Sequence, residues 1–501
     1  MKNNKLLKAI AIVFLVYVVL SWIIPGGTFS SGVLTESGTA PLGIGDIFIY
    51  PISTAITSIF VLIGLCILLI GGLYGVMNKT GVYKNIVEGI TSKFKGKEKT
   101  FLVISILMFA VLSSLTTLYL PLFVLVPLFV AVILSLGYNK MTALLSTVGA
   151  ILVGMIGTTY GYNMGGYNYV NYFFELGVNS NIVYKVALFV LVTVILLVFV
   201  IKTSKLETSK KKNAKKVTKK DTKAETKKTA KKEVKEEKVE EPKVVIPLYD
   251  SKQKGSKKAT GLVIVLVLTV VVSLVSMFNW AGALGIEKTW FDEIYTKITE
   301  IKLNNYPIFA NIMGSINPFG YWSNYEFAML LVMAILLIGL IYNLKCKDLF
   351  EAVKEGMKEM IPVAVVAIFA NVMLLVVNSV GSTFFPVIAN FFFEMTKGLN
   401  VITMAVISGI GSVLYSDFPY LMNSLYDPVR NLYAETYSIA VVIMQAVYGF
   451  VMMIVPTSVI LVAGLSYLDI SYKEWLKNNW KLLVLLLVAI LGVAVAMMLL
   501  V

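Results

Sequence analysis

Apolar runs of about 20 residues recur along the whole chain, and shorter polar stretches separate them. A helix of about 20 apolar residues is long enough to cross the hydrocarbon core of a bilayer. A soluble two-domain protein has no need of so many such runs, so the pattern predicts an all-α polytopic membrane protein. Nine crossings are predicted, at residues 6–24, 51–77, 141–174, 182–201, 261–280, 326–342, 361–377, 435–467 and 482–501.

Two long apolar runs carry polar interruptions at matching places. Residues 101–163 are interrupted by the sequence LTTLY and again from Gly157 onward, and residues 401–459 are interrupted by YSDFP and by VPTS. Such interruptions are costly, because backbone groups freed from a helix find no water in hydrocarbon. Interrupted hydrophobic segments at corresponding places in two halves of a chain point to the binding site of a secondary transporter.

Loop charges predict that the two interrupted runs have opposite orientations. Lys and Arg gather in cytoplasmic loops; residues 25–50 contain neither, whereas residues 203–257 hold 19 Lys against 9 Asp and Glu. The N-terminus, with three Lys before the first apolar run, is therefore placed in the cytoplasm and the C-terminus outside. Because Thr116 also aligns with Ser416 at an offset of about 300 residues, we predict an inverted repeat.

The first part of each interrupted run has the length and the flanking residues expected of a helical hairpin. Residues 101–136 have basic residues on both sides, so the chain should enter and leave on the same face of the membrane. About 36 residues give two arms that are slightly short for complete crossings of about 20 residues each. A re-entrant hairpin with its tip at residues 113–121 fits better than two short spans, which stay open as the alternative. Residues 401–432 form the second predicted hairpin.

Hairpin tips and broken helices that meet near the midplane would supply a polar site. Helix N-termini there offer unpaired N–H groups to an anionic group, and hydroxyls and carbonyls suit a dehydrated cation such as Na⁺. The alternative is that these Ser and Thr side chains only join helices through hydrogen bonds. No resident metal ion is predicted, but a coupling cation is expected near Gly157, Thr158, Thr457 and Ser458. The candidate substrate-binding residues are Thr116, Thr117, Thr158, Thr159, Asn163, Ser416, Asp417, Thr457 and Ser458.

Asp417 is the most specific of these candidates. Buried carboxylates in membranes usually form pairs or carry protons, so Asp417 is a candidate proton or cation carrier, or a counter-charge to a basic substrate group. The structural alternative is an N-cap for the second arm of the hairpin. Asp427 and Arg430 lie three residues apart, and we interpret them as neutralising each other locally.

Composition excludes several classes of function. The chain has no His, which removes His-based zinc sites and Ser-His triads, and its 2 Cys suggest no disulfide framework. No nucleophile–base pair and no Asp pair of the intramembrane-protease type is visible, so no enzyme is predicted. No G-x-x-x-x-G-K-[ST] motif is present, so ATP drive is not predicted either. The net charge of +15 is concentrated in the Lys-rich segment, so nucleic acid is not a predicted partner.

The expected activity is cation-coupled secondary active transport. The expected partners are a small polar organic substrate, coupling Na⁺ or H⁺ and the lipid bilayer, with no cofactor. The alternative function is a transporter-derived receptor or scaffold protein with a degenerate substrate site.

The sequence PTS at residues 456–458 is followed by SYKEWLK at 471–477. This C-terminal pattern resembles the ending of YfcC-like carriers, in the C4-dicarboxylate anaerobic carrier group of the ion-transporter superfamily, and the resemblance covers about residues 50–200 and 350–501. The weaker matches are GGLYGVMNKTG at 71–81, LGY at 136–138 and KEGMKEM at 354–360. Both hairpin tips depart from the pattern, so only Thr457 and Ser458 carry over directly. The substrate stays open between a carboxylate, an amino acid, a peptide and a basic metabolite.

The resemblance implies a homodimer in the bacterial plasma membrane that moves its substrate by an elevator-type shift. A scaffold would be formed by residues 1–77 and by residues 258–345, which include an external loop. The first transport repeat would be residues 78–202, with hairpin 101–136 and broken helix 141–174, and residues 203–257 a disordered cytoplasmic linker. The second repeat, residues 346–501, would contain hairpin 401–432, broken helix 435–467 and a last helix at 482–501.

Overall fold

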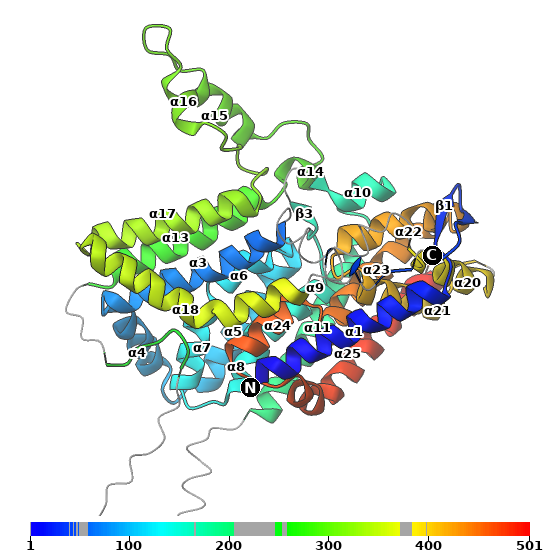
Figure 1. Cartoon of the computed structure of the whole chain (residues 1–501), viewed down its shortest axis with the longest axis horizontal. Coiled ribbons are helices and arrows are strands. Elements are labelled where there is room, and N and C mark those ends of the chain that lie inside the picture. Colours follow the sequence, from blue (N-terminus) through cyan, green and yellow to red (C-terminus); the bar gives the residue numbers. More distant parts are fainter. Residues whose placement is uncertain are drawn as a thin grey trace, which may run out of the picture.

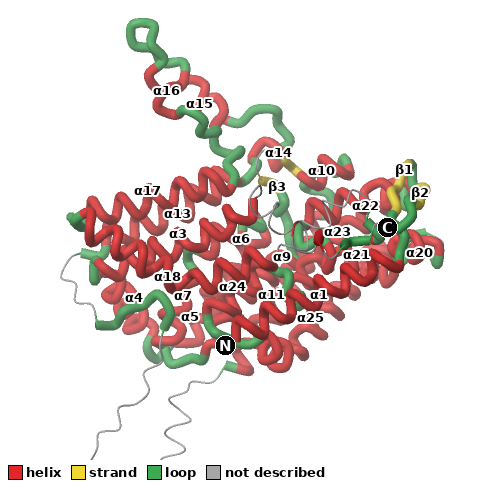
Figure 2. Tube along the Cα trace, viewed as in Figure 1, coloured by secondary structure: helices red, strands yellow, loops and turns green. Residues whose placement is uncertain are grey.

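The computed structural model describes residues 2–39, 41–43, 45–46, 49, 59–164, 167–204, 246–252, 258–370, 383–396 and 398–500. The described chain is mostly helical (Figures 1 and 2), which confirms the predicted class. Within this part, 7 helices are long and apolar enough to cross a membrane. Six of them match predicted crossings, and the other, Glu98–Thr116, is the first arm of the predicted hairpin. The 7 spans are Asn4–Ile23, Leu62–Lys79, Glu98–Thr116, Ile182–Thr203, Thr260–Met277, Asn324–Ile341 and Tyr472–Leu500.

The elements run in chain order as follows. Up to the Lys-rich segment they are α1 (Lys2–Ile23), β1 (Gly27–Ser30), β2 (Val33–Glu36), α3 (Ile59–Lys79), α4 (Val82–Phe94), α5 (Glu98–Thr116), α6 (Tyr119–Phe123), α7 (Val126–Ser135), α8 (Lys140–Leu144), a π-helical turn (Leu145–Gly149), α9 (Ala150–Ile156), β3 (Asn163–Met164), β4 (Tyr167–Asn168), α10 (Tyr169–Phe174) and α11 (Ile182–Thr203). After it they are α13 (Thr260–Met277), α14 (Trp280–Leu284), α15 (Trp290–Thr299), α16 (Ile308–Met313), α17 (Asn324–Ile341), α18 (Cys346–Ala370), α20 (Phe385–Glu394), α21 (Val401–Leu414), α22 (Phe418–Leu432), α23 (Tyr437–Met452), α24 (Val459–Tyr467) and α25 (Tyr472–Leu500).

Small residues bring α3 and α18 together backbone to backbone. A Cβ atom on Gly75 would lie 2.1 Å from the carbonyl oxygen of Ala352, and one on Gly356 would lie 2.0 Å from the carbonyl oxygen of Gly71. Neither contact leaves room for a methyl group. Close approach through small residues is a common way to join helices in a bilayer, where lipid offers no hydrophobic drive. This crossing is the tightest helix contact that positions the first half against the second.

The first hairpin turns at Thr117, as the polar interruption predicts. Thr117 adopts the left-handed conformation with φ 55°, which is unusual for a β-branched residue. The helix α5 therefore ends at Thr116, and the second arm continues as α6 and α7. The helix–turn–helix is confirmed, while its depth in the bilayer stays a prediction.

Both predicted helix breaks are also confirmed. The helix α9 ends at Ile156, and Gly157 leaves helical geometry with φ −93° and ψ 42°. Only glycine fits at position 157, because a Cβ atom there would lie 2.4 Å from the Cα of Phe189 on α11. In the second half, α23 ends at Met452 and α24 begins at Val459. Pro456 lies in this gap, where its missing N–H cannot continue the helix.

The structure differs from the predicted elements in three places. The predicted crossing 361–377 begins earlier than expected, because one helix, α18, runs from Cys346 through Pro362 to Ala370; the remainder of that crossing lies outside the described residues. The external loop forms α14, α15 and α16, and Figure 1 shows α15 and α16 standing away from the helix bundle. The all-α prediction also missed two short antiparallel β-hairpins, β1–β2 and β3–β4.

The C-terminal end of the predicted linker is bound to the helices. The backbone of Leu248 donates to Glu359 Oε2 (2.8 Å) and accepts from Asn78 Nδ2 (2.9 Å). Tyr467 Oη donates to the carbonyl of Pro247 at 3.0 Å, and the ring of Tyr249 packs on that of Tyr83. The prediction of a disordered connector is therefore wrong for residues 246–252, because their backbone is held by α3, α18 and α24. Residues 205–245 and 253–257 lie outside the described residues.

Candidate functional site

Ser114 binds the tip of the first hairpin to the first helix break. Its hydroxyl donates to the carbonyl of Gly157 at 2.6 Å, where α9 has lost its own hydrogen-bond partners. The carbonyl of Ser114 in turn accepts from the backbone N–H of Thr159 (2.9 Å) and from the hydroxyl of Thr158 (3.3 Å). The helix break and the hairpin tip therefore supply hydrogen-bond partners for each other's backbone groups, which lipid could not supply.

The two threonines of the first tip also make hydrogen bonds within the fold. Thr116 Oγ1 donates to the carbonyl of Leu112 at 2.7 Å. Thr117 Oγ1 accepts from the backbone N–H of Tyr162 at 2.9 Å, which joins the tip to the chain beyond the break. The Thr117 contact matches the structural alternative of joining segments, whereas the Thr116 bond lies within α5; any role of either residue toward a ligand stays a prediction.

The tip of the second hairpin meets the same region from the other half of the chain. Tyr448 Oη, on α23, donates to the carbonyl of Ser416 at 3.0 Å. The ring of Phe418 lies 4.2 Å from that of Tyr162 and 5.2 Å from that of Tyr448, measured between centroids. Tyr162 therefore contacts both tips, through its backbone at Thr117 and through its ring at Phe418.

The two broken helices cross beside their breaks. A Cβ on Gly449 of α23 would lie 2.5 Å from the backbone nitrogen of Ile156, the last residue of α9. Gly157 follows Ile156 directly, and α23 ends only one turn after Gly449, at Met452. Both helix breaks and both hairpin tips thus gather around one crossing.

Asp417 lies at this crossing without serving as a helix cap. It occupies the N-cap position of α22, but its side chain makes no capping hydrogen bond. Its Oδ1 atom is buried and has no hydrogen-bond partner among the described residues. The N-cap interpretation is therefore wrong, and the carboxylate has hydrogen-bonding capacity that the fold does not use.

Other buried polar atoms near the second break are also left without partners. Thr457 and Ser458 are 0% and 1% exposed, and neither hydroxyl has a partner among the described residues. The same holds for Gln445 Oε1 on α23 and for Tyr162 Oη. An unsatisfied buried polar group costs about 1–3 kcal/mol. The second half of the site therefore holds several groups that a ligand could satisfy.

Asn163 belongs to a different local structure than predicted. Its backbone pairs with Asn168 in the β3–β4 hairpin, so the chain does not resume the helix after the break. Gly165 and Gly166, through which a continuing helix was expected, lie outside the described residues.

Several residues at the crossing were missed as site candidates. Ser114, Gln445 and Tyr448 all contribute contacts or unpaired atoms there. Gln445 offered a signal, since an amide within an apolar helix usually faces other protein groups. Tyr448 offered none, because the chain has 26 tyrosines.

A separate cavity of about 620 Å³ lies between α10 and α14. Its lining includes Tyr167, Asn171, Asn279 and Tyr321, and none of the described candidate site residues. Asn179, also in the lining, accepts a hydrogen bond from Tyr160 Oη at 3.2 Å, so the cavity borders the chain after the first break.

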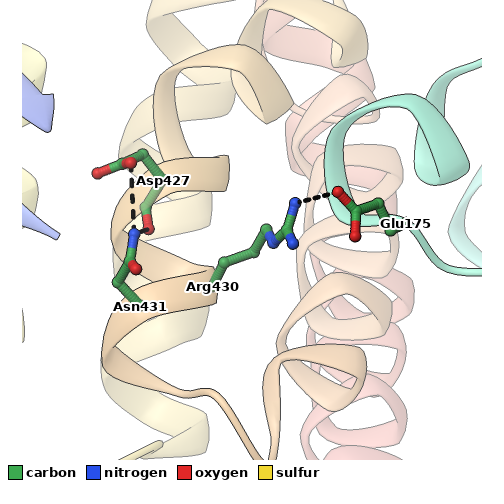
Figure 3. A network of polar contacts seen from close by, with 4 residues as sticks. All are labelled: Glu175, Asp427, Arg430 and Asn431. Atoms are coloured by element: carbon green, nitrogen blue, oxygen red, sulfur yellow. Dashed lines mark hydrogen bonds and ion pairs between the residues drawn. The ribbon is translucent and has the colours of Figure 1, made fainter. Parts of the chain in front are cut away.

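Arg430 is paired differently than predicted. It bonds Glu175, at the end of α10, at 3.0 Å rather than neutralising Asp427 (Figure 3). Asp427 instead accepts from the backbone N–H groups of Ser31 (3.2 Å) and Gly32 (2.7 Å) and from Asn431 Nδ2 (3.3 Å). The interpretation of a local Asp427–Arg430 pair is wrong, because both side chains find partners far away in the sequence.

Replacing Glu175 by glutamine is expected to have a small effect on stability. The Glu175 and Arg430 side chains are 71% and 36% exposed, and exposed pairs of this kind contribute about 0–1 kcal/mol. Thermal unfolding in detergent at low and high salt would measure the loss, which should vanish as salt screens the pair. A large loss that persists in high salt would contradict this assignment.

A comparison with known protein families finds a match over nearly the whole chain. A family model described as C4-dicarboxylate anaerobic carrier matches residues 4–499. The chain belongs to this carrier family. The carrier is therefore a multi-pass membrane transporter and not an enzyme, as predicted. The match extends over the linker and the external loop, which the motif resemblance had left out. The family gives no support to the receptor or scaffold alternative. No curated protein and no solved structure matches the chain.

Proposed function

We propose that the carrier moves a C4-dicarboxylate across the plasma membrane by cation-coupled secondary active transport. The family's name supplies the substrate class. The observation that carries the proposal is the set of buried, unpartnered polar atoms around the crossing of the two broken helices: Asp417 Oδ1, Tyr162 Oη, Thr457 Oγ1 and Ser458 Oγ. A dehydrated solute and cation would satisfy hydrogen-bonding groups that the protein itself leaves open.

The charges in this site explain why transport would be coupled to a cation. A dicarboxylate placed near the Asp417 carboxylate is repelled, and the repulsion is strong in a site from which water is largely excluded. A Na⁺ ion or a proton on Asp417 would remove that repulsion. Cation and dianion would then bind together better than either alone, which is the requirement for symport.

The helix ends offer a second source of binding energy. Ser458 occupies the N-cap position of α24 without a capping hydrogen bond, so the first N–H groups of this helix have no side-chain acceptor. Helix N-termini favour anionic groups such as carboxylates. We assign Thr457 and Ser458 to the substrate carboxylate or to the cation beside it.

The movement that exposes this site to either face is proposed from the repeat pattern. A hairpin, a helix that ends at a break and a long helix follow one another twice, as α5–α7, α9 and α11, and as α21–α22, α23 and α25. A helix resumes directly after the break in the second half alone, as α24. An elevator-type shift of these elements against a scaffold of a homodimer would carry the site across the bilayer. We place the N-terminus in the cytoplasm on the evidence of the loop charges.

Uptake into proteoliposomes tests the proposed function. Purified carrier should accumulate labelled succinate above the external concentration when an inward Na⁺ or H⁺ gradient is imposed, and not when gradients are absent. Unlabelled fumarate should compete, whereas arginine and a dipeptide should not. A flux that does not saturate and ignores both gradients would contradict the proposal and favour a channel.

A further inference from the structure

Lys185 is a buried cation that the fold does not neutralise. It lies in the first turn of α11 and is 4% exposed. Among the described residues, Glu326 is the other charged side chain in the buried class, and it accepts hydrogen bonds from the Ser323 N–H (2.8 Å) and Asn317 Nδ2 (2.9 Å). Lys185 Nζ has no such hydrogen bond and no ion pair within the described part of the chain. A buried ammonium without a partner carries a large desolvation penalty.

The position of Lys185 places it beside the first helix break. Residues 185 and 189 are four apart and therefore share one face of α11, and Asn181 is the N-cap residue that precedes this helix. Asn181 Nδ2 donates to the carbonyl of Ser438 in the first turn of α23 at 3.0 Å. Phe189 packs against Gly157, where a Cβ would lie 2.4 Å from the Phe189 Cα. Lys185 therefore lies one helical turn before the residue that packs on Gly157 at the first helix break.

We infer that Lys185 provides the counter-charge for one carboxylate of the bound dianion. The inference rests on the proposed function and deepens it. The hydroxyls at the helix breaks can donate hydrogen bonds to a dicarboxylate, but they cannot compensate two negative charges, and Asp417 adds a third. The Lys185 side chain is almost wholly removed from solvent and its ammonium has no protein partner among the described residues, so it would gain a charge-assisted hydrogen bond from a carboxylate that arrives during binding.

A purely structural role for Lys185 accounts for less of what is observed. The cation lies near the C-terminal end of α9, where a helix dipole favours positive charge. That end belongs to a helix of 7 residues, and the carbonyl of Gly157 already accepts from Ser114. A dipole contribution of this kind is much smaller than the penalty of burying the charge.

Binding of succinate and of butyrate to purified carrier separates these two roles. Lys185→Met should lower the affinity for succinate by about 30-fold or more, because it removes one member of a desolvated charge pair. The affinity for butyrate, which has one carboxylate, should change by less than about 3-fold. Lys185→Arg should keep the preference for succinate. Lys202→Met, at the exposed end of the same helix, is the matched control and should leave both affinities unchanged.

The stability of the ligand-free variants supplies a readout that is independent of transport. Lys185→Met should unfold at the same temperature as the wild type or at a higher one, because an uncompensated buried charge is lost. A lower unfolding temperature for both Lys185→Met and Lys185→Gln would establish a structural role and overturn the inference. Equal succinate affinities in wild type and Lys185→Met would overturn the inference alone. If the wild type binds no dicarboxylate with or without cations, the proposed function itself is wrong.

Discussion

Replacing Asp417 by asparagine is expected to abolish cation-driven accumulation of substrate. Asparagine keeps the volume of the side chain but removes the negative charge that would hold the cation. The buried Oδ1 of Asp417 has no hydrogen bond to lose in the fold, so the variant should still fold. Gradient-driven uptake should fall by at least about 10-fold, which corresponds to about 1.4 kcal/mol of lost interaction.

Asp427→Asn is the matched control for this experiment. Asp427 lies on the same helix, α22, but its carboxylate accepts hydrogen bonds from the turn between β1 and β2. Its replacement should leave coupling intact. If Asp417→Asn still accumulates succinate in response to the same gradient, Asp417 does not carry the coupling ion.

Replacing Gly356 by alanine is expected to destabilise the whole protein. The added methyl group would lie 2.0 Å from the carbonyl oxygen of Gly71, and neither backbone can move away without separating α3 from α18. Overpacking of a core costs about 1–3 kcal/mol when side chains can adjust. Here the obstacle is backbone, so we expect a loss above that range and little folded protein in size-exclusion chromatography.

Gly492→Ala controls for the loss of a glycine in a long apolar helix. Gly492 lies on α25, and a Cβ there would meet nothing within 4 Å. This variant should elute as the wild type does and unfold at a similar temperature, because alanine favours helix more than glycine does. Equal stability of Gly356→Ala and Gly492→Ala would show that the crossing of α3 and α18 does not hold the two halves together.

The helix breaks and hairpin turns could be predicted because they depend on the types of residue that are adjacent in the sequence. Gly157 followed by two threonines, and Pro456 followed by Thr457 and Ser458, each combine a residue that disfavours helix with polar side chains inside a lipid-length apolar run. Thr116 and Thr117 mark the first tip for the same reason. The partners that satisfy these breaks could not be predicted in the same way. Ser114 finds Gly157 only because α5 packs against α9, and that contact depends on tertiary structure.

The partners of charged residues could not be predicted from the sequence either. Arg430 and Asp427 are near in sequence, and a local pair was the simplest interpretation, but each is held by a residue from another part of the chain. Lys185 was not predicted to matter, because a single lysine near the end of an apolar run usually extends to the membrane surface. Its burial follows from the neighbours of α11, which the sequence does not reveal. The binding of Leu248 to α3 and α18 was hidden by the Lys-rich composition around it.

The central claim is that the crossing of the two broken helices forms the binding site, and ligand-dependent thermal stability tests it most directly. Succinate with the coupling cation, at about 100 times its Kd, should stabilise the wild type by about 2.7 kcal/mol. The double variant Thr457→Val with Ser458→Ala should fold but lose most of this stabilisation. Ser424→Ala, which removes a hydroxyl already bonded to Leu421 within α22, should retain it. Equal stabilisation of the wild type and the double variant, or none in the wild type with any organic anion, would contradict the account.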